Sequence, residues 1–84
     1  MESEKIILIF NNYRDKKQVD IEVPSDITAN ELFVGLNEAY KLGIDATDVK
    51  NCFLRAENPI ALLRGNRTLK EYGLHNGSII NFIE

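Results

Sequence analysis

The side chains with the richest chemistry in this sequence each occur once. Cys52 is the sole cysteine and His75 the sole histidine of the 84 residues. Nucleophilic and metal centres need several such groups at fixed spacings, and this sequence contains no such set. Cys52 has the strand parity of Leu54 and Ala56, which predicts a small core residue, whereas His75 lies beside a turn. We therefore expect no catalytic, cofactor-binding or metal-binding residues, and no enzymatic activity.

Composition and charge narrow the classes of partner. Hydrophobic residues make up 44% of the chain and charged residues 27%, which is typical of one folded domain, here residues 1–84. Thirteen acidic and ten basic side chains give a net charge of -3 without long runs of either sign, which argues against nucleic-acid binding. The polar start, Met1 to Lys5, and the short apolar run, Ile6 to Phe10, predict neither a secretory signal nor a membrane anchor. A lone cysteine is typical of a reducing compartment, so we expect a cytoplasmic protein.

The first half of the chain predicts a hairpin followed by a helix. Apolar residues in Ile6–Phe10 and alternating ones in Val19–Val23 indicate two strands joined by the polar loop Asn11–Lys17. Thr28 followed by Glu31 three residues later forms a capping-box signature. We therefore expect a helix from about residue 29 to residue 42, ended by the left-handed conformation that glycine adopts easily, at position 43.

The second half of the chain predicts three further strands. Cys52–Ala56 is typical of a third strand, and a turn at residues 58 and 59 leads into a short fourth strand at Ile60–Leu63. Thr68–Tyr72 indicates a short helical turn, and Ser78–Ile83 a last strand. The predicted element order is strand, strand, helix, strand, strand, strand.

This order is the one that the β-grasp fold requires. Val23-Pro24-Ser25-Asp26 before the helix, and Arg67-Thr68-Leu69-x-x-Tyr72-x-Leu74 before the last strand, resemble the corresponding stretches of ubiquitin. The resemblance implies an α+β, ubiquitin-like fold: a five-stranded mixed sheet with one helix packed across one face. It also implies a structural role for Tyr72, with its ring at the edge of the core and its hydroxyl bonded to a nearby backbone amide.

Within this superfamily the sequence is most similar to the YukD-like accessory proteins of bacterial type VII (Esx) secretion systems. Phe10-Asn11-Asn12-Tyr13 and Leu69-x-Glu71-x-Gly73-Leu74-x-Asn76-Gly77 resemble that family. The resemblance implies a non-covalent adaptor or regulator that contacts a membrane component of the secretion apparatus or its ATPase.

The last residues bear on two rival functions. Conjugated ubiquitin-like modifiers and sulfur carriers need a flexible tail ending in Gly-Gly, whereas this sequence stops at Glu84, one residue beyond the last predicted strand. We therefore expect no covalent attachment to other proteins. An unrelated scaffold role for an isolated ubiquitin-like domain remains a third alternative.

Polar residues in the strands predict which side chains face away from the helix. Because successive side chains alternate between faces, Lys5 and Asn11 place residues 7 and 9 outside. In the third and last strands, residues two positions away from an outward polar residue are predicted to face outward in the same way. The outward set predicted by this alternation is Ile7, Ile9, Phe53, Arg55, Ile79, Asn81 and Ile83.

Five members of this set are large and apolar, which predicts one patch on the open face of the sheet. An apolar patch on a small protein is typical of a protein-binding site, and Phe53 is the expected hot spot. Alternatively, Tyr13, the Asn58–Ala61 loop or a second copy of the chain in a homodimer covers part of it.

Overall fold

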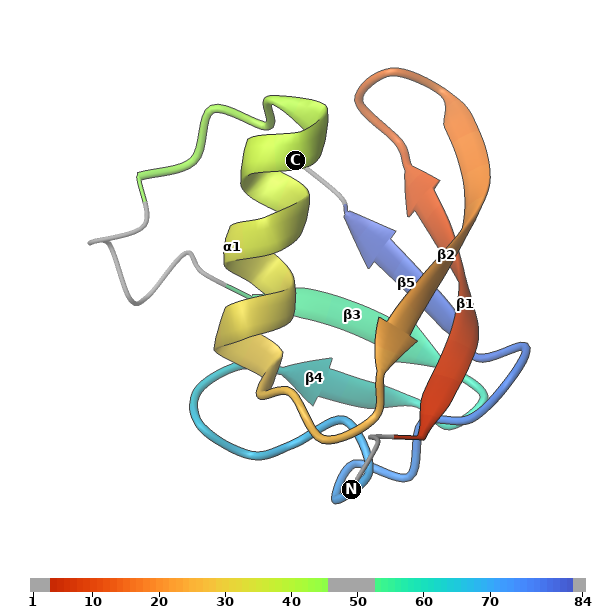
Figure 1. Ribbon diagram of the computed structural model, residues 1–84. Coiled ribbons are helices and arrows are strands. Elements are labelled where there is room, and N and C mark those ends of the chain that lie inside the picture. Colours follow the sequence, from red (N-terminus) through yellow and green to blue (C-terminus); the bar gives the residue numbers. More distant parts are fainter. Residues whose placement is uncertain (1–3, 46–52, 83–84) are drawn as a thin grey trace.

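The computed structural model describes residues 4–45 and 53–82, which form a five-stranded sheet with one helix lying across it (Figure 1). The elements in these ranges are β1 (Lys5–Asn12), β2 (Lys17–Pro24), α1 (Ala29–Tyr40), β3 (Leu54–Glu57), β4 (Ala61–Leu63) and β5 (Ile79–Phe82). Cys52, Ile83 and Glu84 lie outside the described residues, so the placement predicted for each of them has no structural counterpart here.

The strand order is β2-β1-β5-β3-β4. β1 and β5 are parallel, whereas β1 with β2, β3 with β4 and β3 with β5 are antiparallel. The sheet is therefore mixed, with the first, last and third strands at its centre. Both the predicted element order and the predicted β-grasp architecture are confirmed.

The β1–β2 hairpin is longer than its apolar residues indicate. The ladder continues beyond Phe10↔Val19 through two further pairs to Asn12↔Lys17, so only residues 13–16 form the turn. The Asn12 side chain supports this turn, because its Nδ2 donates to Asp15 Oδ2 at 3.2 Å. The predicted loop is shortened because backbone pairing does not require apolar side chains.

The start of α1 follows the capping signature. The backbone N–H of Glu31 donates to Thr28 Oγ1, and the backbone N–H of Thr28 donates to Glu31 Oε1, both at 3.1 Å. These reciprocal bonds satisfy two of the free N–H groups at the helix start. The helix begins at Ala29 as predicted.

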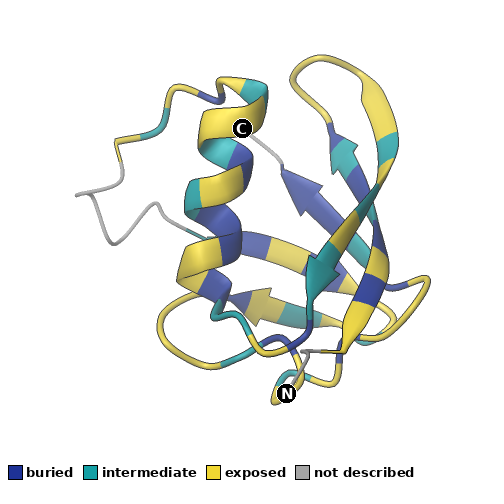
Figure 2. Cartoon of the chain, viewed as in Figure 1, coloured by how far each residue is buried: buried dark blue, intermediate teal, exposed yellow. Residues whose placement is uncertain are grey.

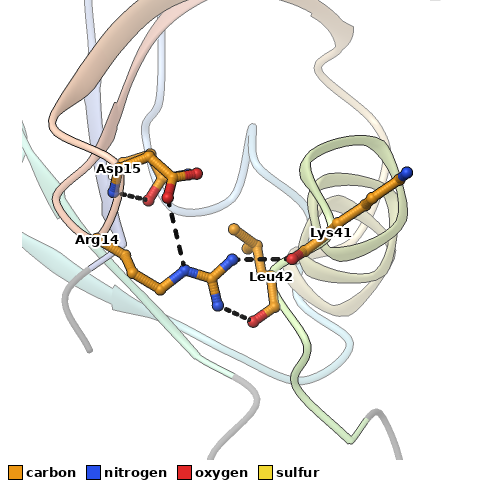
Figure 3. Close-up of polar contacts among 5 residues, drawn as sticks. Arg14, Asp15, Lys41 and Leu42 are labelled. Atoms are coloured by element: carbon orange, nitrogen blue, oxygen red, sulfur yellow. Dashed lines mark hydrogen bonds and ion pairs between the residues drawn. The ribbon is translucent and has the colours of Figure 1, made fainter.

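The end of α1 differs from the prediction. The helix ends at Tyr40, two residues before the predicted end, and Lys41, with φ of 52°, is its left-handed cap. Gly43 adopts the left-handed conformation predicted for it, with φ of 74°, but it lies in the loop beyond the helix. Figure 3 shows that Arg14, in the β1–β2 turn, donates hydrogen bonds to the carbonyl oxygens of Lys41 and Leu42, just beyond this end. A guanidinium at this position satisfies free carbonyls and interacts favourably with the negative end of the helix dipole.

A second capping box holds the predicted turn at residues 68–72. Thr68 Oγ1 accepts from the backbone N–H of Glu71, and Glu71 Oε1 accepts from the backbone N–H of Thr68 at 3.0 Å. The bond from this backbone N–H, followed by that from the Thr68 hydroxyl, lowers the pKa of the Glu71 carboxyl. Thr28 and Thr68 form a β-bridge, so the two boxes lie side by side.

Tyr72 lies at the edge of the core, as the resemblance to ubiquitin implied. Its side chain is half-buried against the core cluster. Its hydroxyl donates to the carbonyl oxygen of Arg64 at 2.9 Å and accepts from the backbone N–H of the same residue at 3.4 Å. The structural role expected for this tyrosine is therefore confirmed.

The core lies between α1 and the inner face of the sheet, where dark blue segments gather in Figure 2. Its buried members within the described ranges are Ile6, Leu8, Phe10, Ala29, Leu32, Phe33, Leu36, Leu42, Leu54, Ala56, Leu63, Leu69, Leu74, Ile80 and Phe82. The inward parity predicted for β1, β3 and β5 is confirmed for the described residues, since the apolar residues predicted to face inward belong to this set: Ile6, Leu8, Phe10, Leu54, Ala56, Ile80 and Phe82.

Candidate protein-binding surface

The outer face of the sheet is the surface on which the sequence places its site residues. Figure 1 shows α1 on the opposite side, and no helix or strand of residues 4–45 and 53–82 forms a layer over this face. Every second side chain of β1, β5 and β3 therefore points toward solvent. The register of these strands decides which of those side chains lie together.

Three isoleucines form one apolar part of this face. Ile9 and Ile79 are directly paired between the parallel strands β1 and β5, and Ile7 lies two residues before Ile9. Ile7 is 46% exposed, whereas Ile9 and Ile79 are half-buried. We call Ile7, Ile9 and Ile79 the isoleucine cluster.

Phe53 does not join this cluster. The register places Ile79 opposite Glu57, four residues along β3 from position 53, and Phe53 itself precedes the first residue of the strand. At about 3.3 Å per residue this separation is roughly 13 Å along the strand. Among the described residues, Phe53, which is half-buried, therefore lies apart from the isoleucine cluster, and Ile83, the remaining apolar member of the predicted patch, lies outside the described residues.

A row of polar side chains crosses the outer face between the isoleucine cluster and Phe53. Asn11 Nδ2 donates to Asn81 Oδ1, and Asn81 Nδ2 donates to Glu57 Oε2, both at 2.9 Å. Asn81 points outward as predicted, yet it is only 6% exposed because these neighbours enclose it. Its side chain therefore holds three central strands together and offers little surface to a partner. Arg55, paired with Asn81 in the ladder, is exposed.

A hollow of about 530 Å³ lies beside this row, over β3 and β4. Three apolar side chains on its lining are strongly exposed: Ile60 (90%), Tyr13 (53%) and Leu62 (44%). Leu62 is paired with Arg55 on the outer face. The exposure of Tyr13 and Ile60 shows that they add apolar surface to this face and do not simply cover it.

The alternation of side chains would have identified Leu62 as an outward residue, because it lies between the inward residues Ala61 and Leu63 of a short strand. No comparable sequence signal marks Ile60, which is exposed because it lies in the turn at residues 58–60. We call Tyr13, Arg55, Ile60 and Leu62 the hollow's rim.

The described residues contain no group of three or more His, Cys, Asp or Glu side chains arranged to hold a metal ion. His75 is exposed, with its Nδ1 at 2.9 Å from the carbonyl oxygen of Asn76. α1 has twelve residues, too few to cross a bilayer. Within the described part of the chain no helix is long and apolar enough to span a membrane.

The sequence model of the family described as "WXG100 protein secretion system (Wss), protein YukD" matches residues 8–81. This chain belongs to the YukD family. The match includes Ile9 and Ile79 of the isoleucine cluster and the whole of the hollow's rim. No curated protein sequence matches this YukD family member.

Solved structures similar to this YukD family member are ubiquitin-like domains. The C-terminal ubiquitin-like domain of mouse tubulin-specific chaperone e superposes with a TM-score of 0.68 at 11% identity, covering 100% of this chain and 92% of that domain. The UBL domain of Plasmodium falciparum Dsk2 gives 0.61 at 19% identity, covering 93% and 97%. The ubiquitin-like domain of an Arabidopsis thaliana protein gives 0.65 at 20% identity, covering 92% and 73%. These likenesses establish the fold.

Proposed function

We propose that this YukD family member is a non-covalent adaptor of a bacterial WXG100, or type VII, secretion system, acting in the cytoplasm by binding protein partners. The observation that carries the proposal is the outer face of the sheet, where apolar side chains are exposed beside an open hollow. The family match supplies the secretion system. In this proposal the chain performs no catalysis and binds neither cofactor nor nucleic acid.

The hollow's rim has the composition of an interface core. Interfaces are enriched in Tyr and Arg, and hot spots cluster where such anchors are surrounded by apolar contacts that exclude water. Tyr13 and Arg55 supply two side chains of these types, and Leu62 and Ile60 supply apolar area next to them. A partner that filled the hollow would bury all four side chains together.

The proposed partner is a component of the secretion apparatus, either its membrane-embedded component or its ATPase. The acceptor would be a cytosolic portion of such a component that projects apolar side chains into the hollow. Arg55 at the rim favours a partner with an acidic side chain at the edge of the contact.

Direct binding measurements test the proposal. The cytosolic parts of the ATPase and of the membrane component, encoded by the same genome, are purified separately and titrated with this chain by calorimetry. We expect one of them to bind, and the variant Leu62→Lys to weaken binding at least about tenfold, since it places a charge among the apolar contacts. Ala39→Lys is the matched control, because Ala39 is exposed on α1, on the other side of the sheet.

Secretion of WXG100 proteins provides the cellular measurement. A deletion strain complemented with wild-type protein or the Ala39→Lys variant should release WXG100 proteins to the medium, whereas complementation with Leu62→Lys should not. Equal secretion with both variants, or binding of neither component, would contradict the proposal. Immunoblots of the same cells should show the free protein alone, and a ladder of adducts stable to boiling in detergent and reductant would favour a covalent modifier.

A further inference from the structure

The free edge of β2 offers a second surface, which is distinct from the hollow. β2 is the last strand on its side of the sheet, and no strand of the described residues lies beyond it. Its eight residues contrast with the three of β4, the strand at the opposite edge. An edge strand carries a row of backbone groups that can pair with another extended chain.

The hydrogen bonds of β1 show which backbone groups of β2 face this edge. The N–H of Ile9 donates to the carbonyl oxygen of Ser78, and the carbonyl oxygen of Ile7 accepts from the N–H of Gly77, both at 2.9 Å. The odd-numbered residues of β1 therefore direct their backbone groups toward β5. Its even-numbered residues direct theirs toward β2.

The β1–β2 register carries this alternation into β2. The even-numbered residues of β1 pair with Val19, Ile21 and Val23, so the backbone groups of these three residues are used in the hairpin. The N–H of Ser25 donates to the carbonyl oxygen of Glu4 at 2.8 Å and continues the same pattern. The N–H and C=O groups of residues 18, 20 and 22 therefore point outward, where a sixth strand would lie.

The inner side of β2 is apolar and incompletely covered. Val19, Ile21 and Val23 pack against the core cluster, yet all three remain half-buried. A hollow of about 300 Å³ opens at one end of this row, lined by residues of the hairpin and by Tyr40 at the end of α1. Apolar side chains of an added strand would lie against this row, and a large one would fit the hollow.

The outer side of β2 is acidic. Gln18, Asp20 and Glu22 alternate with the three apolar residues and are exposed, and Glu22 reaches one basic neighbour, Lys5, at 3.8 Å. In a sheet, directly opposed side chains of opposite charge stabilise the pairing, whereas like charges weaken it. Basic side chains on an added strand would therefore complement this side.

We propose that β2 accepts an extended segment of a protein partner as a sixth strand, and that this segment alternates apolar with basic residues. Backbone groups of residues 18, 20 and 22 supply the hydrogen bonds, and the two sides of the strand select the alternation. A second copy of β2 fits this edge poorly. If two copies of β2 paired antiparallel along nearly their whole length through these outward groups, Asp20 would lie opposite either Asp20 or Glu22 of the second copy. Like charges would then face each other.

Short synthetic peptides test the proposal. The probe is a capped eight-residue peptide of alternating Lys and Val, and the comparison peptide alternates Glu and Val. Titration is followed by amide chemical shifts and by hydrogen exchange in the full chain. We expect the Lys peptide to slow exchange at the amides of Gln18, Asp20 and Glu22, and to bind about tenfold more tightly than the Glu peptide.

Two variants test separately how backbone pairing and charge contribute to peptide binding. Asp20→Pro removes one outward N–H while leaving the β1–β2 ladder intact, and it should abolish slowed exchange along the edge. The double variant Asp20→Lys, Glu22→Lys should reverse the preference so that the Glu peptide binds more tightly, and it requires no proline in the strand. Leu62→Lys, the variant that disrupts the hollow, should bind the Lys peptide like the wild type, so failure of one proposal is distinguishable from failure of the other.

Three outcomes would overturn the proposal: no binding of either peptide, unchanged peptide preference in the double lysine variant, or shift changes confined to the hollow's rim. Pairing of β2 with a second copy would appear as concentration-dependent slowing of exchange at the same three amides in the absence of peptide.

Discussion

The two faces of this sheet are built from the same strands, yet they differ in how completely they are covered. On β3, Leu54 and Ala56 face α1 and are 1% and 2% exposed, whereas Arg55 and Glu57 face outward and are exposed. The inner face of β1, β3 and β5 is covered by a helix and a continuous apolar cluster. The outer face combines an isoleucine cluster, a bonded polar row and an open hollow. The inner face should therefore determine stability and the outer rim should determine binding.

The largest expected effect is on the inner face. Leu54→Ala removes a fully buried side chain and should lower the free energy of unfolding by roughly 2 to 5 kcal/mol. Phe53→Ala, one residue earlier and half-buried, should cost clearly less. Urea unfolding followed by circular dichroism measures both. If Phe53→Ala were the more destabilising variant, the contrast between the two faces at β3 would be lost.

Asn81 tests whether the whole outer face is dispensable for stability. Asn81→Ala removes the two side-chain bonds that link β1, β5 and β3 on that face, and should cost about 1 to 3 kcal/mol because Asn11 loses its partner. Asn66→Ala, at an exposed turn position, is the control. An unchanged unfolding midpoint would show that the polar row contributes nothing to stability.

The start of the covering helix gives a smaller effect. Thr28→Ala should lower stability by about 1 kcal/mol, the usual loss for an N-cap, whereas Thr28→Ser should retain most of it. Thermal and urea denaturation measure both variants. Equal midpoints for the alanine and serine variants would mean that the cap bond does not contribute.

The second box predicts a modest pH dependence. Because the pKa of Glu71 is lowered in the folded protein, its carboxylate contributes stability above its unfolded pKa, and this contribution is lost as pH falls through the folded pKa. Glu71→Gln should therefore flatten the acid side of the stability profile. Parallel profiles for variant and wild type in acid would contradict the assignment.

The smallest effect on stability is expected at the hollow's rim. Ile60→Ser changes a side chain that is 90% exposed and should shift the free energy of unfolding by less than about 0.5 kcal/mol. The same variant should weaken binding to the secretion component measured by calorimetry. A clear loss of stability would place Ile60 among the packed residues and weaken the contrast between the faces.

Local signals predicted most of the fold. The capping residues located the helix start, and alternation assigned the inward side chains of the central strands correctly. The predicted helix end was wrong by two residues, and Arg14, which comes from the hairpin turn and is distant in sequence, binds the carbonyl oxygens just beyond the observed end. No local pattern contains that contact.

The surface was less predictable than the core. The alternation of side chains along a strand predicts which face each residue lies on, but it does not predict how that strand is aligned with its neighbours. Parity placed Ile9, Ile79 and Asn81 on the outer face, but the pairing of β5 with β1 and β3 determines which of them meet. That pairing separates Phe53 from the isoleucine cluster and buries Asn81 between its neighbours. The exposure of Ile60 depends on where its turn lies relative to the sheet, and the sequence of the turn alone does not predict that position.

The position of β5 has a consequence for synthesis. β5 lies between β1 and β3, so the last of the described strands in chain order fills the centre of the sheet. While residues 79–82 remain in the ribosome, β1 and β3 expose the backbone edges that β5 will later pair. Such edges are prone to association with other nascent chains. The sheet therefore cannot form strand by strand in chain order, and the edges of β1 and β3 stay unpaired until residues 79–82 reach them.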